Sequence, residues 1–463
     1  MEAAALYAEI LAADPTDAEA MAGRVRALLA SDRWREGLEA ARRYAPGDAA
    51  PPVARAALGE ALYRAGLLRE AAAVLDSLAA VPAPPARALL MLGLVRAADG
   101  RDDEAASLFA RAVETDPSDR DILRGAAGAA PTRARAIELL GRYLELSAGD
   151  DSDRIEGARG TLRLFRALGE RAVWVPASRP PRAEIPLRRL RDRSGRATGL
   201  VIEMATGRGK PVRLLLDTGS SGLFLVERIA QRAGFAPLAE ETVFGGGGEG
   251  KHPSSRGLFA SAAFGGVSFS DALASTTTEE IEPMGLYHGV LGLSAFSGYR
   301  VTIDLVRDRL VLERAEGGDS GEGETPGETA GEPWWDVGGQ MLVEAGARGA
   351  PQGLFMLDTG ASASLLSTAY AASCPRASVG EPTGVRGFGG TLRDARSVRG
   401  VLLILQGLEA PPSVMTASDL TSRSRLGGVE IAGFIGLDLL DRSIVAIDTR
   451  SHRVIVRRPP QKG

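Results

Sequence analysis

The chain has 463 residues, enough for about three domains of ordinary size, and 44% of its residues are hydrophobic, as is usual for a soluble globular protein. Its 55 Lys and Arg residues against 59 Asp and Glu residues give a formal net charge of −4, which excludes a strongly basic surface for nucleic acid or an anionic membrane. Only three His residues and one Cys occur, which excludes a thiolate zinc site, an iron–sulfur cluster and an internal disulfide framework. We therefore expect chemistry carried by carboxylates, hydroxyls and the backbone, with no metal and no cofactor.

The N-terminal third of the chain carries a repeat of 34 residues. Leu58-Gly59 recurs as Leu92-Gly93, and Asp14-Pro15 recurs three periods later as Asp116-Pro117. Small residues where two helices cross, with a bulky apolar residue in the groove beside them, resemble tetratricopeptide repeats. The pattern predicts an all-α helical-repeat domain over residues 1–170, with a shortened fourth unit that runs through Ala136, Leu140 and Tyr143.

The start of the chain does not resemble a secretory signal, because MEAAALYAEILAADP is acidic and helical in pattern rather than basic and then apolar. The chain also lacks a run of 18 apolar residues, so no membrane span is expected. As it stands, the chain is expected in the cytoplasm. In the repeat register, however, residues 2–13 match a second helix that lacks its first. A start or a removed signal upstream of Met1 is therefore the alternative, and the protein would then be exported.

From about Ala172 the pattern changes to alternating apolar and polar residues with glycine-rich turns, which predicts strands. Residues 316–333, EGGDSGEGETPGETAGEP, are rich in acidic residues and glycine and contain no basic residue. Such a segment cannot bury a core, so it is expected to be a flexible linker. It divides the β-rich region into a first lobe, residues 171–315, and a second lobe, residues 334–463.

The β-rich region contains a repeated motif of its own. Residues 214–221 (LLLDTGSS) are echoed by residues 355–362 (FMLDTGAS), so that in each copy an apolar strand ends in an aspartate, Asp217 or Asp358. A carboxylate at the end of a buried strand needs compensation, and the following glycine allows the backbone to approach it. Downstream, VLGL at 290–293 is echoed by FIGL at 434–437. The sequence therefore predicts two lobes of the same topology.

These motifs resemble those of the aspartic peptidases, here as two retropepsin-like lobes in one chain, over about residues 180–458. The resemblance implies an all-β bilobal acid-protease fold after the helical repeats. It also implies an aspartic endopeptidase in which Asp217 and Asp358 flank one water and hold one proton between them. The expected partners are a polypeptide substrate and a protein bound to the helical repeats; neither nucleic acid nor a membrane span is expected.

The resemblance also assigns supporting roles to the loops that follow the two aspartates. The threonine hydroxyls would bond to backbone and lock the loops together, and the glycine amides would face the carboxylates. Because Ser220 can donate to Asp217 whereas Ala361 cannot donate to Asp358, we expect Asp217 to be the ionised partner. The expected support residues are Thr218, Gly219, Ser220, Thr359, Gly360 and Ser362, and the flap candidates are Phe244, Gly246, Gly247, Phe388 and Gly389.

The residues leave two alternatives to the peptidase open. The chain could be a catalytically inactive peptide-binding or scaffold protein with a peptidase-like fold, or each lobe could pair with a lobe of another chain. Both aspartates are intact, which favours the enzyme, and two complete lobes favour a pair within one chain. Each lobe is expected to end in a hairpin-like pair of strands, residues 301–312 and 445–456, here called the closing hairpins. Asp304 and Asp448 end the first strands of these hairpins and are interpreted as turn-stabilising residues rather than as catalytic ones.

Overall fold

The computed structural model of the protein describes residues 2–150, 152–244, 251–279, 281, 285–314, 331–387, 390–392, 394–410 and 414–459. The chain divides into two compact units. The first consists of Met1–Ile155 and Thr421–Ile431, and the second consists of Glu156–Leu420 and Ala432–Gly463. Among the described helices, none is both long and apolar enough to cross a membrane.

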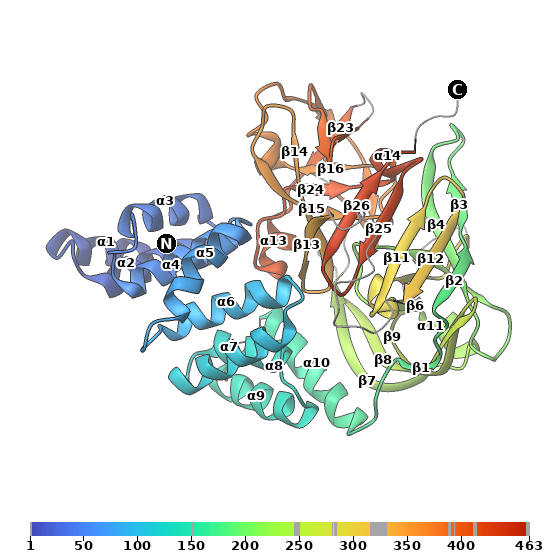
Figure 1. Cartoon of the computed structure of the whole chain (residues 1–463), viewed down its shortest axis with the longest axis horizontal. Coiled ribbons are helices and arrows are strands. Elements are labelled where there is room, and N and C mark those ends of the chain that lie inside the picture. Colours follow the sequence, from blue (N-terminus) through green and yellow to red (C-terminus); the bar gives the residue numbers. More distant parts are fainter. Residues whose placement is uncertain are drawn as a thin grey trace, which may run out of the picture. The chain divides into compact units, whose positions relative to one another are not determined.

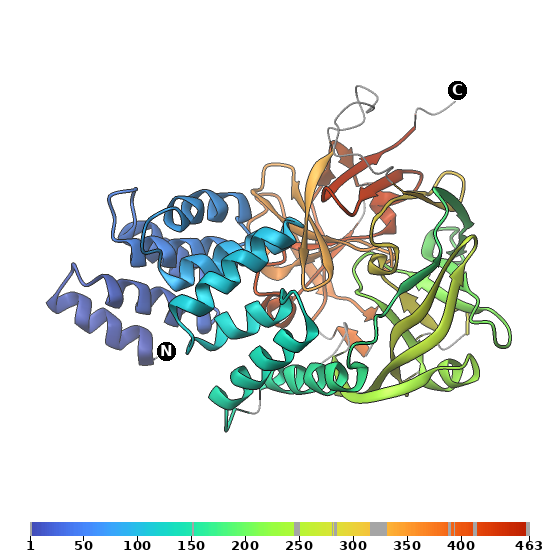
Figure 2. The same ribbon diagram turned by 60° about the horizontal axis from the view of Figure 1, so that its bottom comes forward.

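The first unit is built from helices that follow one another as antiparallel neighbours (Figure 1), and a turned view shows the same stack from blue to teal (Figure 2). Side chains satisfy several of the exposed N-terminal amides: Asp17, for example, accepts a hydrogen bond of 2.9 Å from Ala20 N–H. The helices of the stack are α1 (Glu2–Ala13), α2 (Ala18–Ala30), α3 (Trp34–Tyr44), α4 (Pro52–Arg64), α5 (Leu68–Ala79), α6 (Ala86–Ala98), α7 (Asp102–Thr115), α8 (Arg120–Gly128) and α9 (Arg133–Leu146). Helix α10 (Asp153–Leu168) follows them and continues into the second unit.

Two glycines of the repeat lie where neighbouring helices cross. A Cβ added to Gly59 on α4 would lie 2.4 Å from Leu75 of α5, and one added to Gly93 on α6 would lie 2.7 Å from Phe109 of α7. Side chains at these positions would collide with the apolar residues that fill the groove, as the sequence pattern predicts. The expected helical-repeat architecture of the N-terminal region is thus confirmed.

The second unit is β-rich, and its first part, here called the first lobe, consists of strands β1 to β12. Most of them form a nine-stranded sheet with the order β3-β4-β5-β10-β6-β9-β8-β7, to which β1 is added beside β9. The strands are β1 (Val175–Ser178), β2 (Arg182–Pro186), β3 (Arg188–Arg191), β4 (Ala197–Met204), β5 (Val212–Leu216), β6 (Leu223–Val226), β7 (Ala236–Phe244), β8 (Lys251–Phe264), β9 (Val267–Thr277), β10 (Gly289–Leu291), β11 (Tyr299–Asp304) and β12 (Arg309–Arg314). Helix α11 (Glu227–Arg232) and a short 3₁₀ helix, Leu293–Phe296, complete this lobe.

The second lobe consists of strands β13 to β26, most of which join a fifteen-stranded sheet. Its central strands repeat the connections of the first lobe: β24 pairs parallel with β15 and antiparallel with β16, as β10 does with β5 and β6. The strands are β13 (Glu332–Val337), β14 (Gln340–Ala347), β15 (Gln352–Leu357), β16 (Leu365–Ser367), β17 (Ser378–Pro382), β18 (Val385–Gly387), β19 (Gly390–Leu392), β20 (Arg396–Arg399), β21 (Leu403–Leu405), β22 (Leu408–Glu409), β23 (Met415–Ser418), β24 (Gly433–Ile435), β25 (Ile444–Asp448) and β26 (Arg453–Arg457). The helices of this part of the chain are α12 (Thr368–Ala371), α13 (Thr421–Gly427) and α14 (Leu437–Leu440).

The closing hairpins of the two lobes join edge to edge. Strand β11 pairs antiparallel with β25, with Val301 opposite Ile447, so that the hairpins β11–β12 and β25–β26 form one continuous sheet. Both of these residues are fully buried. This shared sheet makes one body of the two lobes and explains why they form a single compact unit.

The expected linker, residues 316–333, lies outside the described residues except for its end. Strand β13 begins at Glu332, and the next apolar residues anchor it to the sheet. Trp334 stacks on His452 with ring centroids 4.0 Å apart, and its Nε1 donates a hydrogen bond of 3.2 Å to the carbonyl of Asp448. The tryptophan therefore fixes the start of the second lobe.

Candidate active site

The two aspartates of the repeated motif occupy equivalent places in the two lobes. Asp217 follows β5, and its N–H donates to the carbonyl of Leu291 on β10 over 3.0 Å. Asp358 follows β15, and its N–H donates to the carbonyl of Ile435 on β24 over 2.9 Å. Both aspartates are partly exposed, whereas the strands that carry them are buried. Each carboxylate is thus presented at the end of a core strand and braced by the parallel neighbour of that strand.

The threonines that follow the aspartates link the two loops by reciprocal hydrogen bonds. Thr218 N–H donates to Thr359 Oγ1 and Thr359 N–H donates to Thr218 Oγ1, each over 3.1 Å. The hydroxyl of Thr359 in turn donates to the carbonyl of Leu216 over 2.8 Å, and that of Thr218 donates to the carbonyl of Leu357. Both threonines are buried, at 2% and 0% exposure, so these bonds lie in a low-dielectric interior. The loops therefore hold each other in a fixed position.

The glycines of the motif bring the two carboxylates into one small space. Gly219 N–H donates to Asp217 Oδ1 over 2.8 Å, and Gly360 N–H donates to Asp358 Oδ1 over 2.9 Å. A Cβ added to Gly219 would lie 3.1 Å from Asp358 Cγ, and one added to Gly360 would lie 2.7 Å from Asp217 Cγ. Each glycine thus lies against the carboxylate of the opposite lobe. A larger residue at either position would push the two carboxylates apart.

The loop copies differ at the residue after the glycine. Ala361 N–H donates to Asp358 Oδ1 over 2.9 Å. The same N–H also donates to the main-chain carbonyl of Asp358 over 3.3 Å, as Ser220 N–H does to that of Asp217 over 3.3 Å. Ser362 is exposed. A role of the Ser220 hydroxyl in favouring the ionised form of Asp217 stays a prediction.

The downstream glycines pack behind the loops, in contact with backbone. A Cβ added to Gly292 would lie 2.1 Å from the carbonyl oxygen of Ser220, and one added to Gly436 would lie 2.6 Å from the carbonyl carbon of Ala363. Sequence reasoning missed the polar pair beside Gly436. Ser364 Oγ donates to Asp438 Oδ1 over 2.6 Å and accepts from Gly436 N–H over 3.0 Å. The sequence feature that could have indicated this pair is Asp438, two residues after Gly436.

The flap candidates fall only in part on described residues. Phe244 ends β7, which forms a long antiparallel hairpin with β8. In the second lobe, β18 and β19 form a shorter hairpin, with Gly387 opposite Gly390. Gly246, Gly247, Phe388 and Gly389 lie outside the described residues. Hairpins at these two places are the arrangement that paired flaps require, and the flap role itself stays a prediction.

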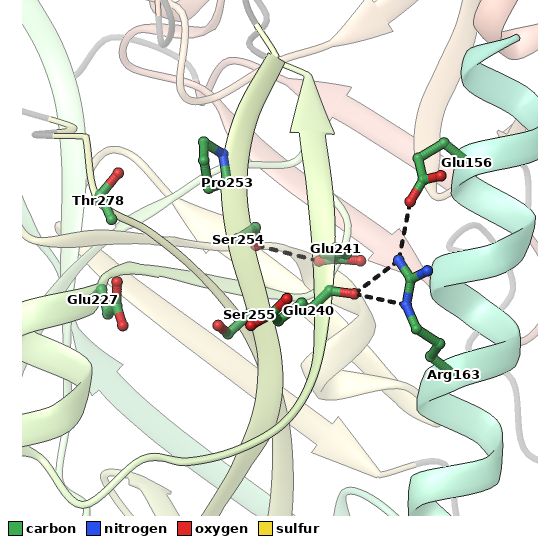
Figure 3. Close-up of a pocket in the computed structure, with 9 residues that line it drawn as sticks. All are labelled: Glu156, Arg163, Glu227, Glu240, Glu241, Pro253, Ser254, Ser255 and Thr278. Atoms are coloured by element: carbon green, nitrogen blue, oxygen red, sulfur yellow. Dashed lines mark hydrogen bonds and ion pairs between the residues drawn. The ribbon is translucent and has the colours of Figure 1, made fainter. Parts of the chain in front are cut away.

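A cavity of about 500 Å³ is lined by residues of α10, of the β7–β8 hairpin and of α11 together with Thr278 (Figure 3), and neither Asp217 nor Asp358 is among its lining residues. Arg163 of α10 points toward β7, where its Nε and Nη2 donate to the carbonyl of Glu240 over 3.3 and 3.1 Å. Leu164 and Leu168 of the same helix pack in one cluster with Leu258 of β8. Helix α10 therefore supports the hairpin that carries the first flap candidate. The cavity is lined by Glu156, Arg163, Glu227, Glu240, Glu241, Pro253, Ser254, Ser255 and Thr278.

The carboxylates of the closing hairpins stabilise turns, as the sequence suggested. Asp304 is buried, and burial opposes its ionisation, but the Arg307 side chain and the N–H groups of Arg307 and Val306 donate to it and lower its pKa. Burial likewise opposes ionisation of Asp448, and N–H groups of Arg450 and Ser451 lower its pKa. Within the described residues, no group of three or more His, Cys, Asp or Glu side chains is placed to hold a metal ion.

Comparison with known proteins identifies part of the first lobe. The family model of the aspartyl proteases matches residues 203–295, which include the loop of Asp217 and the strand that ends at Leu291. No curated protein was found to match the chain.

Three solved structures resemble parts of the chain. A retropepsin-like aspartic protease from Rickettsia conorii is 21% identical over 30% of this chain and 95% of that one, with a TM-score of 0.21. YrrB, a TPR protein with an unusual peptide-binding site, is 21% identical over 32% of this chain and 77% of that one, with a TM-score of 0.23. Basic 7S globulin from soybean is 12% identical over 59% of this chain and 93% of that one, with a TM-score of 0.35. Residues 203–295, with Asp217 at the end of β5, are thus similar to the aspartyl proteases by the family match.

Proposed function

We propose that the protein is an aspartic endopeptidase that hydrolyses peptide bonds with a water held between Asp217 and Asp358. The observation that carries this proposal is the reciprocal bonding of Thr218 and Thr359, which fixes the two aspartate loops against each other. It is supported by the match of residues 203–295 to the aspartyl proteases, which are hydrolases.

The chemistry follows from the closeness of two carboxylates. Two such groups do not both ionise readily, so the pair holds one proton. The ionised carboxylate takes a proton from the water as the water oxygen bonds to the scissile carbonyl carbon, and the protonated carboxylate donates its proton to the carbonyl oxygen. When the tetrahedral intermediate collapses, the carbon–nitrogen bond breaks and the leaving nitrogen takes the proton that came from the water. One hydroxyl of the intermediate returns its proton to the other carboxylate, which restores the pair with one shared proton. Acid–base assistance of this kind is worth about 10²–10⁴ in rate.

Substrate access and water exclusion fit the same proposal. Asp217 and Asp358 are partly exposed, so a peptide can reach them. We propose that the β7–β8 and β18–β19 hairpins close over an extended peptide as flaps, which would exclude bulk water during reaction.

We further propose that the helical repeats form a protein-binding module. Support comes from a cavity of about 420 Å³ on the first unit, where Leu92 and Leu108 are flanked by charged groups such as Arg96 and Arg111. An apolar floor with a charged rim suits a polypeptide. In this arrangement the repeats would raise the local concentration of a protein substrate near the peptidase.

The deciding experiment measures cleavage of a peptide library and of an unfolded protein by the full chain from about pH 3 to 7, where a carboxylate pair titrates. We expect cleavage by the wild type, cleavage about 10²–10⁴ slower by Asp217→Asn, and a lower KM for the protein than for short peptides because of the repeats. Absence of cleavage by the wild type would refute the peptidase. If the wild type then still bound peptides, the non-catalytic peptide-binding protein would be the better description.

A further inference from the structure

A short segment between β23 and β24 is part of the helical-repeat unit rather than of the β-rich unit. This segment, Thr421–Ile431, contains helix α13 and belongs to the same compact unit as residues Met1–Ile155. We call it the docked segment. Nothing in its sequence resembles the helical repeat, so its contacts with the repeat helices require a separate explanation.

The docked segment is held by ion pairs centred on Arg64, the last residue of α4. The guanidinium of Arg64 is largely buried and bonds to Asp32 Oδ1 over 3.1 Å and to Glu430 Oε2 over 3.3 Å. Asp32, in the turn after α2, also pairs with Arg425 of the docked segment. The result is an alternating chain of charges, Arg425–Asp32–Arg64–Glu430, in which repeat residues lie between two residues of the segment.

Backbone contacts fix the same segment more specifically than charge alone. Glu430 N–H donates to the carbonyl of Arg64 over 2.8 Å. Arg154, at the start of α10, donates to the carbonyl of Arg425 over 3.0 Å. Ser424 is buried, and its Oγ accepts from Ile431 N–H over 3.0 Å, which folds the segment back on itself. Val429 and Ile431 are fully buried. A segment with this degree of burial and main-chain bonding is part of the fold and not a loop that rests on a surface.

The docked segment ends directly before a strand of the candidate active site. Ala432, the next residue, donates from its N–H to the carbonyl of Leu354 on β15 over 2.7 Å. Strand β24 then begins at Gly433, and the carbonyl of Ile435 accepts the hydrogen bond from Asp358 N–H. Three residues, 432–434, therefore separate the docked segment from Ile435, whose carbonyl braces Asp358. The docked segment is thus joined to this strand by a short covalent connection.

We propose that the helical repeats hold residues 421–431 as a built-in ligand and thereby position β24 and the loop of Asp358. Arg64 and Asp32 are then a binding site for a segment that carries a cation and a carboxylate five residues apart, as Arg425 and Glu430 are. An outside polypeptide with the same charge pattern competes for this site and lowers the activity. The kinetic part of this proposal rests on the proposed peptidase function, whereas the docking itself does not.

The test uses charge reversals in the docked segment of the full chain. Burial raises the pKa of Glu430, and the attraction of Arg64 opposes that effect. A neutral Gln would remove the ion pair with Arg64 but would also remove the cost of burying a charge, so its net effect on docking would be small. Glu430→Lys instead faces Arg64 with a second cation, and Arg425→Glu faces Asp32 with a second carboxylate. Leu426→Ala, at a residue of α13 that is 61% exposed, is the matched control. The two charge reversals are combined in the double variant Arg425→Glu/Glu430→Lys. If circular dichroism shows that the double variant does not fold, Arg425→Glu alone is used instead.

Hydrogen exchange read by mass spectrometry reports docking without any substrate. We expect the variant Arg425→Glu/Glu430→Lys to exchange the amides of residues 428–432 about tenfold faster than the wild type or Leu426→Ala. In the peptidase assay, we expect kcat to fall about tenfold while KM stays within about twofold, because the Asp358 loop and not substrate binding is affected. Exchange equal to the wild type, or a change in KM alone, would overturn the proposal. Failure of the wild type to cleave peptides would overturn the peptidase and leave the exchange result to decide the docking.

Discussion

At the scale of single residues, the two aspartate loops are near copies that differ after the glycine. The equivalent positions hold Ser220 and Ala361, and the N–H of each donates to the main-chain carbonyl of the preceding aspartate over 3.3 Å. The N–H groups of Gly219 and Gly360 likewise donate to Oδ1 of those aspartates. The loops therefore share these backbone bonds, and the hydroxyl of Ser220 is the side-chain difference between them. Such a difference decides which member of a shared-proton pair is preferentially ionised.

Ser220→Ala tests this difference. If the hydroxyl of Ser220 donates to ionised Asp217, its loss makes that ionisation less favourable, and the acidic limb of the pH–rate profile moves to higher pH. Ala361→Ser is the mirror control, because it offers a hydroxyl to Asp358 and alters the preference of the pair in the opposite sense. Identical profiles for the wild type and both variants would show that this residue does not set the protonation of the pair.

Asp304 gives a pH dependence of stability that is separate from catalysis. Burial disfavours its charge, but donors from Arg307 and Val306 lower its pKa below the ordinary value of 3.8. Since the folded-state pKa is the lower one, the stabilisation is present above about pH 4 and is lost as the pH falls through the folded-state pKa. Asp304→Asn should cost about 1–3 kcal/mol at pH 7 and less near pH 3.

Urea unfolding followed by tryptophan fluorescence at the two pH values measures this effect, since three of the four Trp residues, Trp174, Trp334 and Trp335, belong to the β-rich unit. Glu203→Gln on β4, at an exposed position of the same unit, is the control and should show little change at either pH. A cost for Asp304→Asn that is the same at pH 3 and pH 7 would contradict the assigned role of its ionised form.

At the scale of elements, the helix crossings explain why the repeat keeps its period. Small residues at positions 59 and 93 are required because Leu75 and Phe109 occupy the space that a side chain would need. The size of the apolar side chain opposite each glycine, Leu75 or Phe109, is constrained by the same packing. This mutual requirement, and not helix propensity, is what made the repeat visible in the sequence.

A pair of glycine substitutions tests this account. Gly93→Ala improves helix propensity but places a Cβ 2.7 Å from Phe109, so we expect a net loss of about 1–3 kcal/mol. Gly141→Ala, inside α9 with no atom within 4 Å of the added Cβ, should instead gain up to about 1 kcal/mol. Thermal unfolding followed by circular dichroism compares the two. A stabilising Gly93→Ala would show that the crossing can open and that the glycine is not required there.

Elements with a local signal were predictable, and those defined by long-range contacts were not. The residues named for the expected fourth repeat unit, Ala136, Leu140 and Tyr143, are all buried and lie on α9, which packs against the shorter helix α8. The two aspartate loops were visible because each ends an apolar strand with the same motif. By contrast, Arg64 and Glu430 are 366 residues apart, and an ion pair of that kind leaves no periodicity or motif in the sequence. The pair of Ser364 and Asp438 joins residues 74 apart, and its one local signal was the aspartate two residues after Gly436.

At the scale of the whole molecule, symmetry between the two lobes organises the β-rich unit. The closing hairpins meet through β11 and β25, and the aspartate loops meet through Thr218 and Thr359. The lobes are thus joined at two places, one in the shared sheet and one at the candidate active site. This double connection favours a pair of lobes within one chain over pairing with a lobe of another chain. The sequence alone had left both arrangements open.

The most direct test of the account is whether Asp217 and Asp358 act as one unit. We propose to compare kcat for peptide hydrolysis by Asp217→Asn, Asp358→Asn and the double variant with that of the wild type. Residues that act as one unit give non-additive losses, so each single variant and the double variant should fall to the same level, about 10²–10⁴ below the wild type. Activity retained by either single variant, or losses that multiply in the double variant, would contradict a shared catalytic water between the two aspartates.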